Sequence, residues 1–200
     1  MALPTSRLVV HSVPSGLVEG IRAVVGGYTV ENLFGEASIR ALFAPRVVQI
    51  IGPAYQGYIE RRFFRSAARP GVRTLGAPDQ AALRQLADAC EGEAWEHAGI
   101  TVDEPHVFGC FVDGHLAAAA RYRPAWGETA HIGVVTHPAD RRRHYGSAVV
   151  SAATTQALDA GFIVLYQTLL ANAPSVALAT GLGYQAYASH LAIRLTSDGA

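Results

Sequence analysis

The spacing of apolar residues in the second half of the chain switches repeatedly between a helix period and a strand period. Apolar residues of the run AALRQLADAC recur at three and four positions, which is typical of one face of a helix. The run Phe162–Leu170 is almost continuously apolar and predicts a buried central strand. Asp113 and Gly114 separate two strand-like runs and predict a tight hairpin, because both turn residues must take positive φ.

From residue 72 onward the patterns predict a regular order of elements. They are strand Val72–Leu75, helices Ala77–Cys90 and Gly92–Gly99, strands Val107–Asp113, His115–Tyr122 and Ala130–Val135, helix Tyr145–Ala160, strand Phe162–Leu170, helix Pro174–Thr180, and strands Tyr184–Tyr187 and His190–Leu195. Gly181 and Gly183 are the expected stop of the last helix, since glycine takes the left-handed conformation that ends many helices. This order predicts a mixed α/β sheet with helices on both faces.

The first 70 residues show a similar order of patterns. The predicted elements are strand Leu8–Val13, helices Ser15–Val25 and Glu31–Phe43, and a strand pair Val47–Ile51 and Gln56–Glu60 around Gly52 and Pro53. Two interpretations remain open: a duplicated half-domain, or an unrelated extension that covers a sheet edge. The Arg- and Pro-rich stretch Glu60–Val72 is the expected linker, which divides the chain into residues 1–70 and 71–197.

Composition narrows the classes of partner. The 200 residues carry 16 Lys and Arg against 16 Asp and Glu. The chain therefore has no net positive charge that would attract nucleic acid or an anionic membrane surface. Two cysteines without a paired or metal-like spacing fit a reducing compartment, and the first residues lack a signal-peptide pattern. No apolar run is long enough to span a membrane. We therefore expect a cytoplasmic protein that binds neither nucleic acid nor membrane and holds no metal.

The densest positive charge lies where a predicted strand runs into a predicted helix, in THPADRRRHYGSAVVSAA (Thr136–Ala153). The first N–H groups of a helix have no intrahelical acceptor, and the helix dipole adds partial positive charge there. Gly146 removes a side chain where a phosphate would approach the backbone. The guanidinium groups of Arg141, Arg142 and Arg143 suit phosphate oxygens. The alternative is a helix start with exposed arginines, which the dipole would disfavour by about 0.3–1 kcal/mol for each poorly placed charge.

Two segments together resemble a known family. The residues Val135, Pro138, Arg141, Gly146 and Ala148 follow the spacing V-x-x-P-x-x-R-x-x-x-x-G-x-A, which resembles the acetyl-CoA pyrophosphate motif of the GCN5-related N-acetyltransferases (GNAT). The segment NAPSVALATGLGYQAY, residues 172–187, is similar to a second segment of that family, and the resemblance covers residues 72–195. It implies a mixed, mostly antiparallel sheet flanked by helices. It also implies acyl transfer to an amine, with acetyl-CoA as the co-substrate and no metal.

The resemblance implies roles for particular residues. The strand before the junction would bind the pantetheine arm through its backbone, and the thioester would enter where this strand splays from Phe162–Leu170. The loop and first helical turn that follow would surround the pyrophosphate. The implied cofactor-binding residues are Val134, Val135, Arg141, Arg142, Arg143, His144, Tyr145, Gly146, Ser147, Asn172 and Ser175.

The chain departs from the family pattern at two positions. His144 stands where the family usually has glycine, so its backbone must adopt a conformation that glycine takes easily, at a cost of about zero to a few kcal/mol. Ala179 stands where many members carry a tyrosine that protonates the departing thiolate, and a methyl group cannot donate a proton. Tyr184, Tyr187 and Tyr166 are the nearby candidates for that role, and solvent is another.

Amine acylation needs a neutral amine, and therefore a base or a water path to one. His131 begins the strand that feeds the cleft, and Glu96 lies near the expected acceptor side. A packed histidine and a solvated surface carboxylate are the more common roles for such residues. His131, Glu96 and Tyr184 are nevertheless the predicted catalytic residues.

The expected function is acetyl-CoA-dependent N-acetylation of a small-molecule or peptide amine by direct attack on the thioester. A homodimer is one arrangement that we consider. The alternative is a CoA-binding or partner-binding module of the same fold that has lost catalysis, which the residues at His144 and Ala179 motivate.

Overall fold

The structure is a computed structural model that describes residues 12–13, 15–29, 32, 35–90, 93–101 and 104–196. The chain forms two compact units, Met1–Pro53 with His190–Ala200, and Ala54–Ser189. The boundary between them falls within two strands, β1 (Val47–Ile59) and β7 (Gln185–Leu195). The linker expected at residues 60–72 lies inside the second unit, which also contains every candidate site residue.

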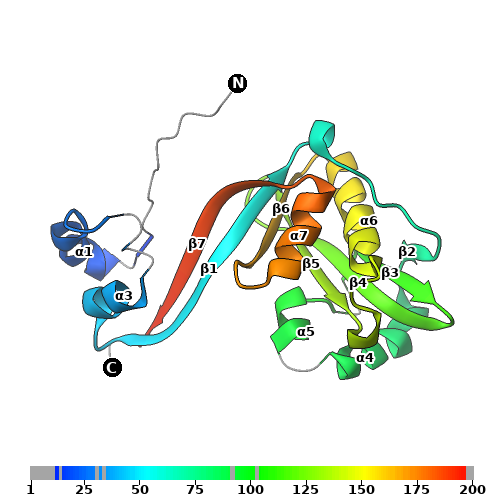
Figure 1. Ribbon diagram of the computed structural model, residues 1–200, viewed down its shortest axis with the longest axis horizontal. Helices are drawn as coiled ribbons and strands as arrows, with labels where there is room; N and C mark the ends of the chain where they lie inside the picture. Colours follow the sequence, from blue (N-terminus) through cyan, green and yellow to red (C-terminus); the bar gives the residue numbers. More distant parts are fainter. Residues whose placement is uncertain are drawn as a thin grey trace. The chain divides into compact units, whose positions relative to one another are not determined.

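Within the described residues, seven strands form one sheet in the order β2-β3-β4-β5-β6-β1-β7 (Figure 1). The strands between β1 and β7 are β2 (Val72–Thr74), β3 (Val107–Val112), β4 (His115–Pro124), β5 (Thr129–Thr136) and β6 (Ile163–Leu169). β5 and β6 pair in parallel, whereas the pairs β2–β3, β3–β4, β4–β5 and β1–β6 are antiparallel. The expectation of a mixed, mostly antiparallel sheet is confirmed, and β6 is an interior strand as its apolar run predicts.

The hairpin between β3 and β4 has the expected two-residue turn. Asp113 and Gly114 take φ values of 47° and 82°, and Val112 pairs with His115 directly across the turn. Asp and Gly both tolerate positive φ, which matches the right-handed twist of the flanking strands. The local conformational preferences of Asp113 and Gly114 are therefore sufficient to explain this turn.

Helices cover both faces of the sheet in the unit of residues 54–189 (Figure 1). They are α4 (Gln80–Ala89), α5 (Glu93–Ala98), α6 (Tyr145–Asp159) and α7 (Ala173–Leu182), with short 3-10 helices η2 (Arg61–Phe63), η3 (Ala77–Asp79) and η4 (Pro138–Asp140). Neighbouring strand residues point to opposite faces. One core therefore joins Ile132 to α6 and α7, and the other joins Val135 to α4 and α5.

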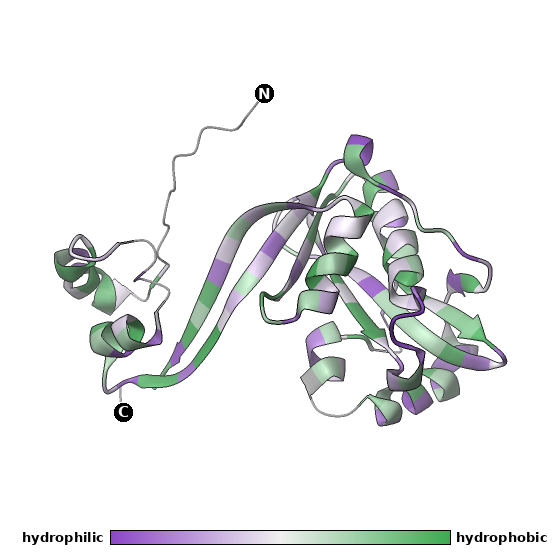
Figure 2. Ribbon diagram, viewed as in Figure 1, coloured by the Kyte–Doolittle hydropathy of each residue, from purple (hydrophilic) through white to green (hydrophobic). Residues whose placement is uncertain are grey.

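Among the helices that the structure describes, α6 is the most deeply buried. Val149, Val150 and Ala153 are fully inaccessible, and the small side chains of this helix allow it to pack closely on β3, β4 and β5. Figure 2 shows hydrophilic residues concentrated on the loop that enters α6, in contrast to the mostly pale colours of the helix itself. Among the helices of the described ranges, none has the length and apolar character needed to cross a membrane.

The first unit contains η1 (Ser15–Leu17), α1 (Val18–Val25) and α3 (Glu36–Phe43), which lie within the two predicted helices. The strand predicted at Leu8–Val13 lies almost entirely outside the described residues. The predicted strand pair around Gly52 and Pro53 is wrong, because β1 is one continuous strand. Pairing with β6 begins only at the next residue, Ala54, so the ladder between β1 and β6 does not need the N–H that Pro53 lacks. The described part of these residues therefore does not repeat the order of the second half.

Two boundaries near the C-terminus also differ from the predictions. The helix α7 continues through Gly181 to Leu182, and only Gly183, with φ of 99°, ends it in the left-handed conformation. The two predicted terminal strands are a single strand, β7, because the chain stays extended through Ala188 and Ser189.

An ion pair joins β2 to the start of α4. Both guanidinium nitrogens Nη1 and Nη2 of Arg73 donate to the carboxylate of Asp79, at 2.8 and 2.6 Å, and the Gly76 N–H donates to the same carboxylate at 3.0 Å. The hydrogen bond from Arg73 is the main reason why the pKa of Asp79 falls to about 2. The carboxylate is thus held ionised in the folded state.

We predict that Asp79→Asn lowers the free energy of unfolding at pH 7 by about 1 kcal/mol, because a partly buried charge-assisted hydrogen bond to the half-exposed Arg73 is lost. The native pKa of Asp79 lies below its unfolded value, so this contribution is complete above about pH 4 and disappears as the pH falls through about 2. Chemical denaturation of both proteins between pH 2 and 7 measures the difference. A difference that stays constant over this range would contradict the assignment.

Candidate active site

The strands β5 and β6 diverge after a short ladder. Their parallel pairing runs from Thr129 opposite Ile163 to Ile132 opposite Tyr166 and ends there, although β5 continues to Thr136. The other edge of β5 stays paired with β4 up to Thr136, and the other edge of β6 stays paired with β1 from Val164 to Leu169. The edge of β5 beyond Ile132 therefore presents backbone groups that an extended ligand could pair with. This is the splay that the resemblance implies.

The loop at the open end of this gap contains two left-handed residues. After η4, Arg142 takes φ of 62° and His144 takes φ of 65° with ψ of 13°. His144 is the N-cap of α6 and accepts a hydrogen bond from the Ala148 N–H through its carbonyl oxygen at 3.1 Å. The N–H groups of Tyr145, Gly146 and Ser147 therefore lie in the first helical turn, where no intrahelical acceptor exists. His144 adopts the conformation that a glycine would take without strain.

The three arginines of the loop have different surroundings. Arg141, Arg142 and Arg143 are all exposed, but Arg143 donates from Nη1 to the Oδ1 of Asp140 at 2.9 Å. Its carbonyl oxygen also accepts a hydrogen bond from Arg69 at 2.8 Å. Arg143 is thus held at both its side chain and its backbone.

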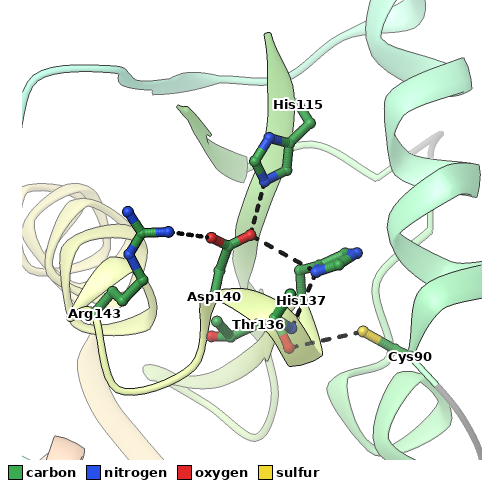
Figure 3. A network of polar contacts seen from close by, with 7 residues as sticks. Cys90, His115, Thr136, His137, Asp140 and Arg143 are labelled. Carbon is green, nitrogen blue, oxygen red and sulfur yellow. Dashed lines mark hydrogen bonds and ion pairs between the residues drawn. The ribbon is translucent and has the colours of Figure 1, made fainter. Parts of the chain in front are cut away.

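Asp140 is the centre of a buried polar network (Figure 3). In addition to Arg143, His115 donates from Nε2 to its Oδ2 at 2.7 Å, and His137 Nδ1 lies 3.7 Å from the same oxygen. The hydrogen bond from His115 lowers the pKa of Asp140 against the opposing effect of burial. Sequence reasoning missed this residue, because an acidic side chain between a proline and three arginines is usually a solvated helix cap.

Packing leaves little room for a side chain at Gly146. A β-carbon at this position would lie 2.8 Å from Thr136 Oγ1 and 3.3 Å from Leu178 Cδ1. The first turn of α6 therefore lies directly against β5 and α7. Tyr145 is buried and Ser147 half-buried, so Tyr145 offers a ligand its backbone and not its side chain.

The two valines of β5 point to opposite faces. Val134 packs with the core under α6 and α7, and Val135 belongs to the core under α4 and α5. Both lie on the stretch of β5 that extends beyond its ladder with β6. They can therefore contribute backbone groups to the gap, while only Val134 places its side chain on the face of the α6 loop.

The start of α7 faces the same region. Asn172 caps this helix by accepting from the Ser175 N–H at 3.3 Å, and the Ser175 hydroxyl lies 2.8 Å from that of Tyr166. Tyr166 occupies the last residue pair of the β5–β6 ladder. Ala179, two turns after the cap, is fully buried in the core. The first turn of α7 is thus tied to the point where β5 and β6 separate.

Tyr184, the predicted proton donor, is buried in the core. Its side chain is 3% exposed, and its hydroxyl lies 2.6 Å from that of Thr154 inside the core. Burial raises its pKa and also raises that of Tyr166 to about 12. Tyr187 is 77% exposed and packs edge-on against Tyr58. Tyr184 is therefore a core residue.

The predicted bases lie on the face covered by α4 and α5. His131 is adjacent to the end of the β5–β6 ladder, and burial, with the charges of Arg121 and Arg123, lowers its pKa to about 4. The Nε2 of His131 is buried without a hydrogen-bond partner. Such a histidine is neutral at physiological pH but is a weak base, because its pKa lies several units below that of an alkylammonium ion. Glu96 is exposed on α5.

Known structures share this fold. The chain superposes on a protein described as a GNAT-family acetyltransferase from Novosphingobium aromaticivorans with a TM-score of 0.59 and 24% identity, covering 76% of this chain and 68% of the other. For a GNAT-family acetyltransferase from Colwellia psychrerythraea the TM-score is 0.61, the identity 17%, and the coverage 80% and 62%. For a GCN5-related N-acetyltransferase from Kribbella flavida the values are 0.52, 22%, 77% and 60%. The chain thus spans less than two thirds of the last two proteins, and at these identities the likeness concerns the fold.

Sequence comparison gives the family directly. No curated protein matches the chain significantly. The model of the acetyltransferase (GNAT) family matches residues 80–184, which is more than half of the 200 residues and includes the gap, the loop and both helices α6 and α7. The chain therefore belongs to the GNAT family of acetyltransferases.

Proposed function

We propose that this protein is an acyl-CoA-dependent N-acyltransferase that transfers an acyl group, with acetyl-CoA as donor, to a small-molecule or peptide amine. The main support for this proposal is the position of the N-terminus of α6 at the open end of the gap between β5 and β6. The loop that precedes this helix contains two residues in the left-handed conformation. A helix N-terminus favours a pyrophosphate, and an open strand edge favours an extended amide-containing arm. Coenzyme A combines these two features in one molecule.

In this proposal the backbone supplies most of the phosphate binding. Left-handed residues within a loop make successive N–H groups converge on one point, and the dipole of α6 adds positive potential there. The exposed guanidinium groups of Arg141 and Arg142 add charge-assisted hydrogen bonds. The pantetheine arm then runs along Val134 and Val135, where the edge of β5 is open.

The chemical step that we propose is direct attack. The nitrogen of a neutral amine forms a bond to the thioester carbonyl carbon, and the resulting oxyanion is stabilised by a backbone N–H near Val134. The carbon–sulfur bond then breaks, the thiolate leaves, and the nitrogen loses one proton to solvent. Because Ala179 and Tyr184 cannot supply a proton, we propose that water protonates the thiolate, whose moderate pKa makes an acid helpful but not essential.

We also propose that His131 does not act as the base. The low pKa of His131 leaves it unable to take a proton from an ammonium ion efficiently, so the amine must react in its neutral form. Glu96 remains the candidate for relaying a proton through water, because it is exposed on the face that carries α5.

The function is tested by titrating the protein with acetyl-CoA in a calorimeter and then measuring thiol release with a panel of amines. We expect saturable binding and thiol release that depends on the amine. Binding without turnover on any amine would identify a CoA-binding module that has lost catalysis. Absence of binding would contradict the proposal at its first step.

The pH dependence of kcat/KM is expected to follow the acceptor and not the enzyme. For two amines whose pKa values differ by about two units, the midpoint of the alkaline rise should move by about the same amount. Steady-state rates for both amines between pH 6 and 10 make this measurement. A midpoint that is the same for both amines would show that the titration of an enzyme group limits the rate, which would contradict this mechanism.

Replacing His144 with glycine separates its backbone role from its side chain. We expect His144→Gly to raise the free energy of unfolding by about 1 kcal/mol, because glycine adopts positive φ without strain. Affinity for CoA should stay within about twofold, since the backbone N–H groups are unchanged. Thermal unfolding and calorimetry provide the two values. A tenfold loss of affinity would instead show that the imidazole binds a phosphate.

A further inference from the structure

The segment of residues 64–71, here called the crossing segment, lies along the outer side of α6. Its Ala67 N–H donates to Ser151 Oγ of α6 at 2.9 Å, and its Arg65 N–H donates to the carbonyl oxygen of Leu182 at 2.9 Å. At its far end the Gly71 carbonyl accepts from the Phe111 N–H at 3.0 Å. The crossing segment is thus fixed to α6, α7 and β3, and it lies before residues 80–184, which the family model matches.

Arg69 of the crossing segment reaches the loop that enters α6. Its guanidinium lies over the ring of Tyr145, 4.6 Å from the centroid, and its Nη1 donates to the Arg143 carbonyl oxygen at 2.8 Å. Arg143 stands between the two left-handed residues, Arg142 and His144. The hydrogen bond from Arg69 therefore holds the peptide group at the centre of the strained stretch.

This stretch needs support from outside. A left-handed conformation costs a residue other than glycine about 1 kcal/mol or more, and such residues persist only where neighbouring groups hold them. Asp140 holds the Arg143 side chain at 2.9 Å, and Arg69 holds its carbonyl. The cation–π contact fixes the Arg69 guanidinium on the buried Tyr145 ring, so the donor is already in place before any ligand binds.

We infer that Arg69 is a positioning residue for the phosphate-binding loop: it holds the Arg143 carbonyl so that the N–H groups at the start of α6 converge on the pyrophosphate of the acyl donor. This inference rests on the proposed function. It assigns a role in donor binding to a residue outside the matched family region, carried by the segment between β1 and β2. Arg69 acts here through the backbone of Arg143, and not as a ligand of phosphate.

The test compares Arg69→Met with the wild type by calorimetry with CoA. Methionine keeps an unbranched side chain but loses the guanidinium, and loss of one charge-assisted hydrogen bond predicts that Kd for CoA rises about tenfold. Pantetheine lacks the pyrophosphate, so its inhibition constant in competition with CoA should be the same for the variant and the wild type. The matched control is Arg65→Met, an exposed arginine of the same segment that should leave Kd for CoA unchanged.

The double variant Arg69→Met/His144→Gly distinguishes positioning from direct phosphate contact. If Arg69 acts by holding a strained loop, relieving the strain at His144 should recover most of the lost affinity for CoA. No recovery would overturn the inference in favour of direct contact, and an equal loss for CoA and pantetheine would overturn it in favour of general destabilisation. Wild-type affinity in Arg69→Met would overturn it outright. Failure of the wild type to bind CoA would instead remove the proposed function, and this inference with it.

Discussion

The early end of the parallel ladder between β5 and β6 is the constraint on which the candidate site depends. Beyond Ile132 and Tyr166 each strand keeps the neighbour on its other edge, β4 for β5 and β1 for β6. The edges of β5 and β6 that face each other carry no further ladder pairs there. The open edge of β5, the first turn of α6 and the first turn of α7 then surround the same space.

The loop that enters α6 shows how such a site is kept ready for a ligand. Arg142 and His144 both hold a conformation that most residues avoid, and the residue between them is tied down twice. Asp140 is itself held by His115, so the support extends to the start of β4. A ligand that meets such a loop does not need to supply the free energy of ordering it, which is the usual advantage of a preorganised site.

The sequence predicted those features that depend on a few adjacent residues. The turn at Asp113 and Gly114 follows from two residues that accept positive φ, and α6 follows from a long apolar pattern that ends before Gly161. The continuity of β1 was not predictable from Gly52 and Pro53, because it depends on where the ladder with β6 begins. The burial of Asp140 and Tyr184, and the reach of Arg69, likewise depend on partners distant in sequence, at His115, Thr154 and Arg143.

The most direct test of this account is to record the amide resonances of the ¹⁵N-labelled protein while CoA is added. The account places the pyrophosphate on the backbone, so the amides of residues 144–147 should show the largest shift changes. Smaller changes should follow along β5 beyond Ile132, where the pantetheine arm would lie. Saturable binding whose largest changes lie away from both segments would contradict the account.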